Sequence, residues 1–132
     1  MTKKEYLMDV LERMGYKPQY DDDGDILLRY QLKHIYFITK EEDEDNFVLV
    51  QLPKFYEFEE EDTTLHLAAC NKVTRGIKMV KVYVDKSLNE VSASCEFFYA
   101  NEEALKLNVA KALRILGLVR TSYRNCLKEL TV

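Results

Sequence analysis

Apolar and polar residues at the start of the chain follow first a helical and then an extended pattern. Residues 3–14 carry apolar side chains at intervals of three and four, which predicts an amphipathic helix with a glycine directly after it. Two extended runs, 16–20 and 25–31, flank an Asp-Asp-Asp-Gly sequence. Its Asp23-Gly24 pair suits the positive φ angles of a tight turn, so an antiparallel hairpin is expected.

Two further runs, 34–39 and 46–52, are rich in β-branched and aromatic residues and predict two more strands. The acidic tract 41–45 between them is typical of a solvated connection. Pro53 has no backbone N–H to donate, so we expect it to end the second of these strands. The aromatic residues that follow would then form a link.

A short second helix is predicted after this link. Asp62, Thr63 or Thr64 can cap its first turn, and Gly76 stands just past its expected end. The residues expected to share its buried face are Leu65, Ala68, Ala69 and Val73.

The runs 78–85 and 90–99 alternate between apolar and polar residues and predict a second hairpin, closed by a turn at 86–89. Its inward face is expected to hold Val80, Val82, Val84, Val91, Ala93, Cys95 and Phe97.

The last thirty residues carry the clearest pattern of the chain. From 101 to 130, apolar residues recur at alternating gaps of four and three, which predicts one continuous helix about 40 Å long. The stripe comprises Leu105, Val109, Ala112, Leu116, Val119, Tyr123, Cys126 and Leu130. Gly117 lies within this helix, where either a bend or a close approach of another backbone would explain it.

The order of these elements is α-β-β-β-β-α-β-β-α, which predicts an α+β fold with an antiparallel sheet of about five to six strands and three helices. The 132 residues suit a single domain, and no Pro-rich or Gly/Ser-rich linker divides them. We therefore expect residues 1–132 to form one domain.

Composition places the chain among ordinary globular proteins, with 47% hydrophobic and 32% charged residues. The N-terminal residues contain no signal-peptide core, and no apolar run reaches the length of about eighteen residues that a membrane span needs. Three widely spaced cysteines, Cys70, Cys95 and Cys126, suit reduced buried thiols. These features predict a cytoplasmic protein with no membrane partner.

The net charge of −4 is distributed unevenly. Residues 41–62 carry ten acids and one base, a local balance of −9, whereas residues 72–86 have a local balance of +4. Acidic loops and basic strand edges can simply keep a protein soluble, or such a bipolar surface can steer a charged partner. The acidic tract would repel phosphate, so no nucleic-acid partner is expected.

A search for residues that carry chemistry finds no established pattern. His34 and His66 fit no zinc-ligand spacing, and the four glycines are too dispersed for a phosphate-binding loop. The acidic turn resembles a calcium loop, but Gln19 and Tyr30 stand where ligands would be needed. No serine lies in a nucleophile elbow. We therefore expect no catalytic residue, no cofactor and no metal, and predict that the protein is not an enzyme.

Two surfaces are candidates for partner binding. On the side of the last hairpin opposite the valines, Met79, Tyr83 and Phe98 could anchor a partner segment, unless helices cover this side as a second core. On the long helix, Leu107 and Leu118 point away from the main stripe. They are either isolated surface leucines or a contact with a homodimer partner or another protein.

Part of the sequence resembles a known family. The segments Leu67-Ala68-Ala69-Cys70-Asn71-Lys72-Val73-Thr74, Lys81-Val82-Tyr83-Val84-Asp85 and Glu96-Phe97-Phe98 resemble the YbjN-like family of bacterial sensory-transduction regulators. The element order also resembles the type III secretion chaperone-like fold. This resemblance implies an antiparallel sheet with packed helices, frequent dimerisation, binding of other proteins' segments and no catalytic residues.

Together, these observations favour a cytoplasmic, non-catalytic protein-interaction domain, chaperone-like or regulatory, that binds a segment of a partner protein. The alternative is a regulatory domain of signal transduction that senses a small ligand.

Overall fold

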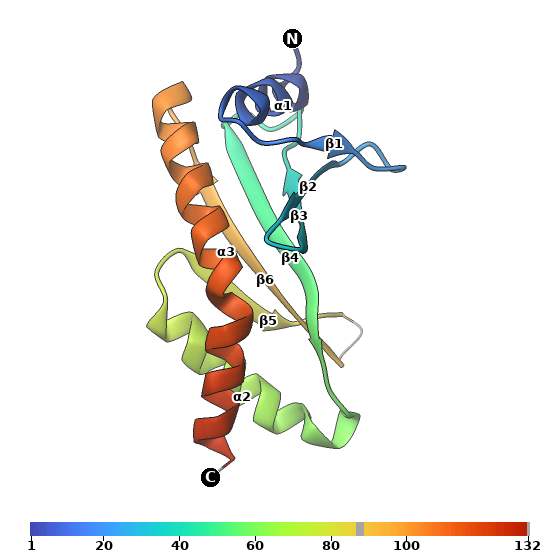
Figure 1. Ribbon diagram of the computed structural model, residues 1–132, viewed down its shortest axis with the longest axis vertical. Coiled ribbons are helices and arrows are strands. Elements are labelled where there is room, and N and C mark those ends of the chain that lie inside the picture. Colours follow the sequence, from blue (N-terminus) through green and yellow to red (C-terminus); the bar gives the residue numbers. More distant parts are fainter. Residues whose placement is uncertain (87–88, 132) are drawn as a thin grey trace.

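The computed structural model describes residues 1–86 and 89–131, and this part of the chain contains three helices and six strands in the predicted order (Figure 1). The helices are α1 (Lys3–Arg13), α2 (Thr63–Gly76) and α3 (Glu102–Leu130), with a 3-10 turn, η1 (Glu60–Asp62), before α2. The strands are β1 (Gln19–Tyr20), β2 (Ile26–Tyr30), β3 (Lys33–Ile38), β4 (Phe47–Glu57), β5 (Val80–Val84) and β6 (Glu90–Phe98).

The strands form one antiparallel sheet in the order β1-β2-β3-β4-β6-β5, which confirms the predicted α+β class. Helix α3 packs on β4 and β6, and α2 packs on β5 and on α3. Figure 1 shows α3 running the length of the molecule, with α1 near its N-terminal end and α2 near its C-terminal end. One continuous cluster of buried apolar residues joins the helices to the inner face of the sheet.

Alternation along the strands and the stripe along α3 build this core. Ile26, Ile35 and Val48 each begin a series of alternate buried residues in β2, β3 and β4. The predicted stripe of α3 is buried from Leu105 to Cys126, while Leu130 at its end is exposed. The inward residues of the last hairpin are confirmed in register, although Val84 is only partly buried. Its predicted turn at 86–89 includes residues 87–88, which lie outside the described residues.

The expectation that Pro53 ends its strand is wrong. Strand β4 continues beside β6 to Glu57, with a shift of register between Leu52 and Tyr56 and a φ of 48° at Lys54. A proline is compatible with such a bulge because a bulged residue does not need to donate to the ladder. The pairing of β4 with β3, however, ends at Gln51.

The predicted buried face of α2 is wrong by part of a turn. Leu65 is only partly buried and Ala68 is exposed, whereas His66 and Cys70 are buried together with the predicted Ala69 and Val73. Two polar or weakly polar side chains can enter the core here because both contact the hydroxyl of Tyr123. Gly76 is the last residue of the helix rather than the first one beyond it.

The first hairpin forms as predicted, but its turn depends on one glycine and one aspartate. Gly24 has a φ of 83°, while Asp23 does not adopt a positive φ. The carboxylate of Asp21 accepts hydrogen bonds from the backbone N–H groups of Asp23 and Asp25, each at 2.9 Å. This carboxylate therefore orders the turn itself, as aspartates commonly do.

Helix α3 continues unbroken through Gly117, and what approaches the helix at this point is two side chains rather than another backbone. A Cβ atom at this position would lie 2.8 Å from Oε1 of Gln31 and 3.2 Å from a ring carbon of Tyr30. The side chains of Tyr30 and Gln31 thus pack closely on the helix backbone, and a larger residue at position 117 would have to displace the flexible end of Gln31.

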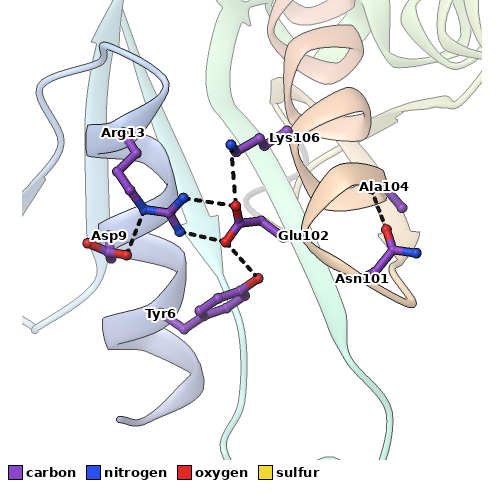
Figure 2. A network of polar contacts seen from close by, with 7 residues as sticks. All are labelled: Tyr6, Asp9, Arg13, Asn101, Glu102, Ala104 and Lys106. Carbon is purple, nitrogen blue, oxygen red and sulfur yellow. Dashed lines mark hydrogen bonds and ion pairs between the residues drawn. The ribbon is translucent and has the colours of Figure 1, made fainter.

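Helices α1 and α3 are joined by a network around Glu102 (Figure 2). The guanidinium of Arg13 donates to both carboxylate oxygens of Glu102, at 2.8 and 2.6 Å, and its Nε donates to Asp9 at 2.9 Å. Lys106 lies 3.3 Å from the same carboxylate, one turn further along α3. The Arg13 hydrogen bonds are the main reason why the pKa of Glu102 falls from 4.5 to about 2.

This network predicts a defined pH dependence. Because the pKa of Glu102 is lower in the folded protein, its pairing should stabilise the fold above pH 4.5 and be lost as the pH falls towards about 2. The difference in unfolding free energy between the wild type and Glu102→Gln, measured by urea denaturation, should shrink over this interval. The matched variant Glu103→Gln should show no such change; equal pH profiles for the two variants would contradict the assignment.

Candidate functional site

The sheet has an outer face that none of the described helices covers. Strand register places alternate residues on this side, opposite the buried core, and none of the large ones belongs to the core cluster. The structure therefore excludes the alternative in which helices bury this side as a second core. The outer face is defined here by Leu27, Tyr36, Ile38, Phe47, Leu49, Tyr83 and Phe98.

Aromatic side chains dominate the end of the outer face near the termination of β6. Phe47 and Phe98 are directly opposite each other on β4 and β6, with ring centroids 5.1 Å apart and a tilt of 54°. Phe98 remains 64% exposed in spite of this contact. Ile38 and Leu49, paired across β3 and β4, extend the apolar surface inward from these rings.

The remainder of the outer face towards β5 is more polar. The amide of Gln51 donates to the hydroxyl of Tyr83 at 3.1 Å, and Lys81 pairs with Glu96 at 3.0 Å. Ser92 and Ser94, which alternation also directs to this side, are buried because longer neighbours surround their short side chains. The outer face thus combines an apolar half with a hydrogen-bonded half.

The free edge of the sheet at β5 is closed to a partner strand at its centre. The hydroxyl of Thr74, on α2, accepts from the backbone N–H of Val82 at 2.9 Å and donates to its carbonyl at 3.2 Å. These are the groups that an added strand would need for pairing. Recognition by strand addition at Val82 is therefore blocked, while the outer face stays open.

The predicted partner-binding residues are not all brought together. Tyr83 and Phe98 lie on the outer face as expected. Met79 does not lie on the outer face. It precedes the first residue of β5, has a φ of 73°, and packs its side chain partly against the core. Leu107 and Leu118 are 55% and 60% exposed, but they lie on α3, which packs on the opposite side of the sheet.

The leucines of α3 flank a positively charged surface. Lys111 and Arg114, both exposed, lie between Leu107 and Leu118 on the same side of the helix. If two copies packed antiparallel through this stripe, the central Lys111 and Arg114 of each copy would meet like charges. The contact predicted at these leucines remains a prediction, and these charges count against a symmetric pair.

Sequence reasoning missed most of the apolar half of the outer face, including Ile38, Phe47 and Leu49. The sequence does indicate this apolar half: the run from Phe47 to Leu52 is apolar at nearly every position rather than at every second one. A strand with this composition presents apolar side chains on both of its faces.

A buried polar cluster lies between α2 and α3. Nδ1 of His66, a side chain only 4% exposed, is 2.6 Å from the hydroxyl of Tyr123, and the Phe58 ring stacks on His66 with centroids 4.2 Å apart. Burial lowers the pKa of His66, raises that of Tyr123 and raises that of Cys70 to about 11. These groups are therefore uncharged at neutral pH, which suits packing better than nucleophilic chemistry.

Among residues 1–86 and 89–131, no group of three or more His, Cys, Asp or Glu side chains is arranged to hold a metal ion. The described helices also include none with the length and apolar composition needed to cross a bilayer. The three cysteines are free and buried, as the sequence predicts.

Comparison with known proteins identifies the fold. No family model and no curated protein sequence matches the chain. The solved structure of YbjN from E. coli, described as a proposed transcription regulator, is similar with a TM-score of 0.69 and 13% identity, covering 87% of this chain and 86% of that one. An uncharacterised protein from Methanothermobacter thermautotrophicus is similar with a TM-score of 0.58 and 12% identity, covering 93% and 97%. The chain therefore has a YbjN-like fold.

The buried cluster leads to a prediction about stability. Tyr123→Phe should leave Nδ1 of His66 without its partner and lower the free energy of unfolding by about 1–3 kcal/mol. Chemical denaturation would measure this loss. Tyr20→Phe removes the same hydroxyl from an exposed ring and should change the free energy by less than about 0.5 kcal/mol. Similar values for both variants would show that the hydroxyl of Tyr123 is unimportant.

Proposed function

From its YbjN-like fold, we propose that this protein is a non-catalytic interaction domain, chaperone-like or regulatory, that binds a segment of a partner protein on its outer face. The observation that carries this proposal is the apolar half of that face, where Phe98 is exposed beside the partly buried Ile38, Phe47 and Leu49, in a sheet whose helices pack on the other side. Phe98, the last residue of β6, is the most exposed large apolar residue of this half at 64%.

Burial of apolar side chains under a partner segment would contribute favourably to the free energy of binding. Full burial of a phenylalanine or leucine side chain contributes about 1.5–3 kcal/mol, so covering Phe98 and its partly buried neighbours would offset much of the entropic cost of association. Phe47 holds the ring of Phe98 from one side, which reduces the conformational freedom lost on binding. Aromatic residues placed in this way are frequent hot spots of interfaces.

Charge indicates which partner suits this face. The backbone N–H of Tyr99 donates to the carbonyl of Asn46 at 3.0 Å, so the acidic tract 41–45 ends beside Phe47 and Phe98. Lys3 partly compensates this tract: its backbone N–H donates to Glu41 at 2.7 Å and its ammonium donates to the backbone carbonyls of Asp43 and Asp45. Within the described residues, the ion pairs involve none of the carboxylates of 41–45, so the tract stays predominantly acidic. The partner segment should therefore carry apolar side chains flanked by lysine or arginine.

We propose the face rather than the edge of the sheet because Thr74 occupies the central backbone groups of β5. We favour a different protein over a second copy as the occupant. Two outer faces brought together would also bring together two acidic tracts of the same sign.

A peptide-display selection tests this proposal. Random peptides would be selected on the wild-type protein and then measured against Phe98→Ala by fluorescence anisotropy. Enriched peptides should contain apolar residues next to lysine or arginine and should lose at least about tenfold in affinity for the variant, because a buried aromatic anchor is removed.

The matched control is Leu67→Ala, which shortens another exposed apolar side chain, on α2 rather than on the outer face. This variant should bind the peptides as the wild type does. Peptides that bind all three proteins equally, or a selection that enriches none, would contradict the proposal. A light-scattering mass of twice the monomer that is lost in Phe98→Ala would instead identify a second copy as the occupant.

A further inference from the structure

A second candidate site lies where β3 and β4 separate. Their pairing ends at Tyr36 and Gln51, although β4 continues beside β6 to Glu57. A cavity of about 500 Å³ opens between the start of β3, the bulge of β4 and α3. This volume lies within the range of roughly 300–1,000 Å³ typical of small-molecule sites.

The side-chain contact at Gly117 lies next to this cavity along the chain, because Leu32 and Lys33, which line the cavity, directly follow Gln31. The side chains of Tyr30 and Gln31 pack on Gly117, and the turn Gln31-Leu32, with φ angles of 50° and 65°, leads from this contact into β3. Arg120 follows Gly117 by three residues, nearly one helical turn, and also lines the cavity. Arg120 from α3 and Lys33 from the start of β3 therefore line the same cavity.

The cavity wall is positively charged in an acidic protein. The positive charges come from Lys33, Lys54 and Arg120, and no aspartate or glutamate lines the cavity. Lys54 is partly neutralised by Glu90, 3.7 Å away. Neither Lys33 nor Arg120 forms an ion pair with any residue in 1–86 or 89–131. With a net charge of −4 for the chain, this gathering of bases favours a small anion over a macromolecular polyanion.

Aromatic rings complete the wall. Tyr36 comes from β3, and Phe55 comes from the bulge of β4. The Phe55 ring is held edge-to-face on Tyr123, with centroids 5.6 Å apart and an interplanar angle of 87°. A ring fixed in this way is suited to pack against a planar ligand group at little cost in conformational entropy.

We propose that this cavity binds a small organic phosphate with a planar heteroaromatic group, the chemistry of a nucleoside monophosphate. Arg120 and Lys33 hold the phosphate, because a guanidinium fork and an ammonium match its oxygens. Tyr36 and Phe55 contact the planar group. This site shares Tyr36 with the outer face but does not include Phe98, and it gives the protein a means of sensing a ligand.

Titration with adenosine monophosphate tests the proposal, using isothermal calorimetry on the full chain. The wild type should bind it saturably, and more tightly than adenosine or inorganic phosphate, because each of these lacks one half of the recognised chemistry. Arg120→Ala should weaken binding at least about tenfold. Arg114→Ala, the same change at another exposed position of α3, should bind as the wild type does.

Three results would overturn the site: no saturable binding by the wild type, equal losses in both arginine variants, or adenosine binding as tightly as its monophosphate. Circular dichroism would verify that the variants are folded, as expected for exposed side chains. Phe98→Ala should leave the titration unchanged. A failure of partner binding at the outer face can therefore be distinguished from a failure of ligand binding in the cavity.

Discussion

All three helices pack on the same face of a six-stranded sheet within the described residues. This one-sided packing determines which face of the sheet is buried and which is left uncovered. The inner face, closed by α3 along its length, supplies the hydrophobic stabilisation. The outer face has to meet either water or another molecule, yet half of it is apolar. Its exposure follows directly from where the helices pack.

The contact between the β2–β3 turn and Gly117 links this architecture to the basic cavity. The side chains of Tyr30 and Gln31 pack on α3 at Gly117, and β3 begins two residues after Gln31. Strand β4 meanwhile follows β6 through its bulge and leaves β3 after Gln51. The cavity between the two strands is lined by Lys33, Lys54 and Arg120. An acidic chain thus has a local positively charged site.

Periodicity predicts the order and type of the elements because each pattern is local to its helix or strand. It predicts neither the continuation of β4 past Pro53 nor the burial of His66, because these depend on β6 and on Tyr123, residues distant in sequence. For the candidate site, alternation identifies Tyr83 and Phe98. It misplaces Met79, since a positive φ interrupts the alternation, and the cavity residues come from three separate segments that no local pattern relates.

The way the sheet is protected supports the proposed role of its outer face. Free strand edges and exposed apolar surfaces are both liabilities for aggregation. Here the edge at β5 is covered by Thr74, and the opposite edge strand has only two residues. The face, by contrast, keeps Phe98 exposed beside an acidic tract. Protected edges beside an exposed aromatic face are expected if a partner protein covers that face.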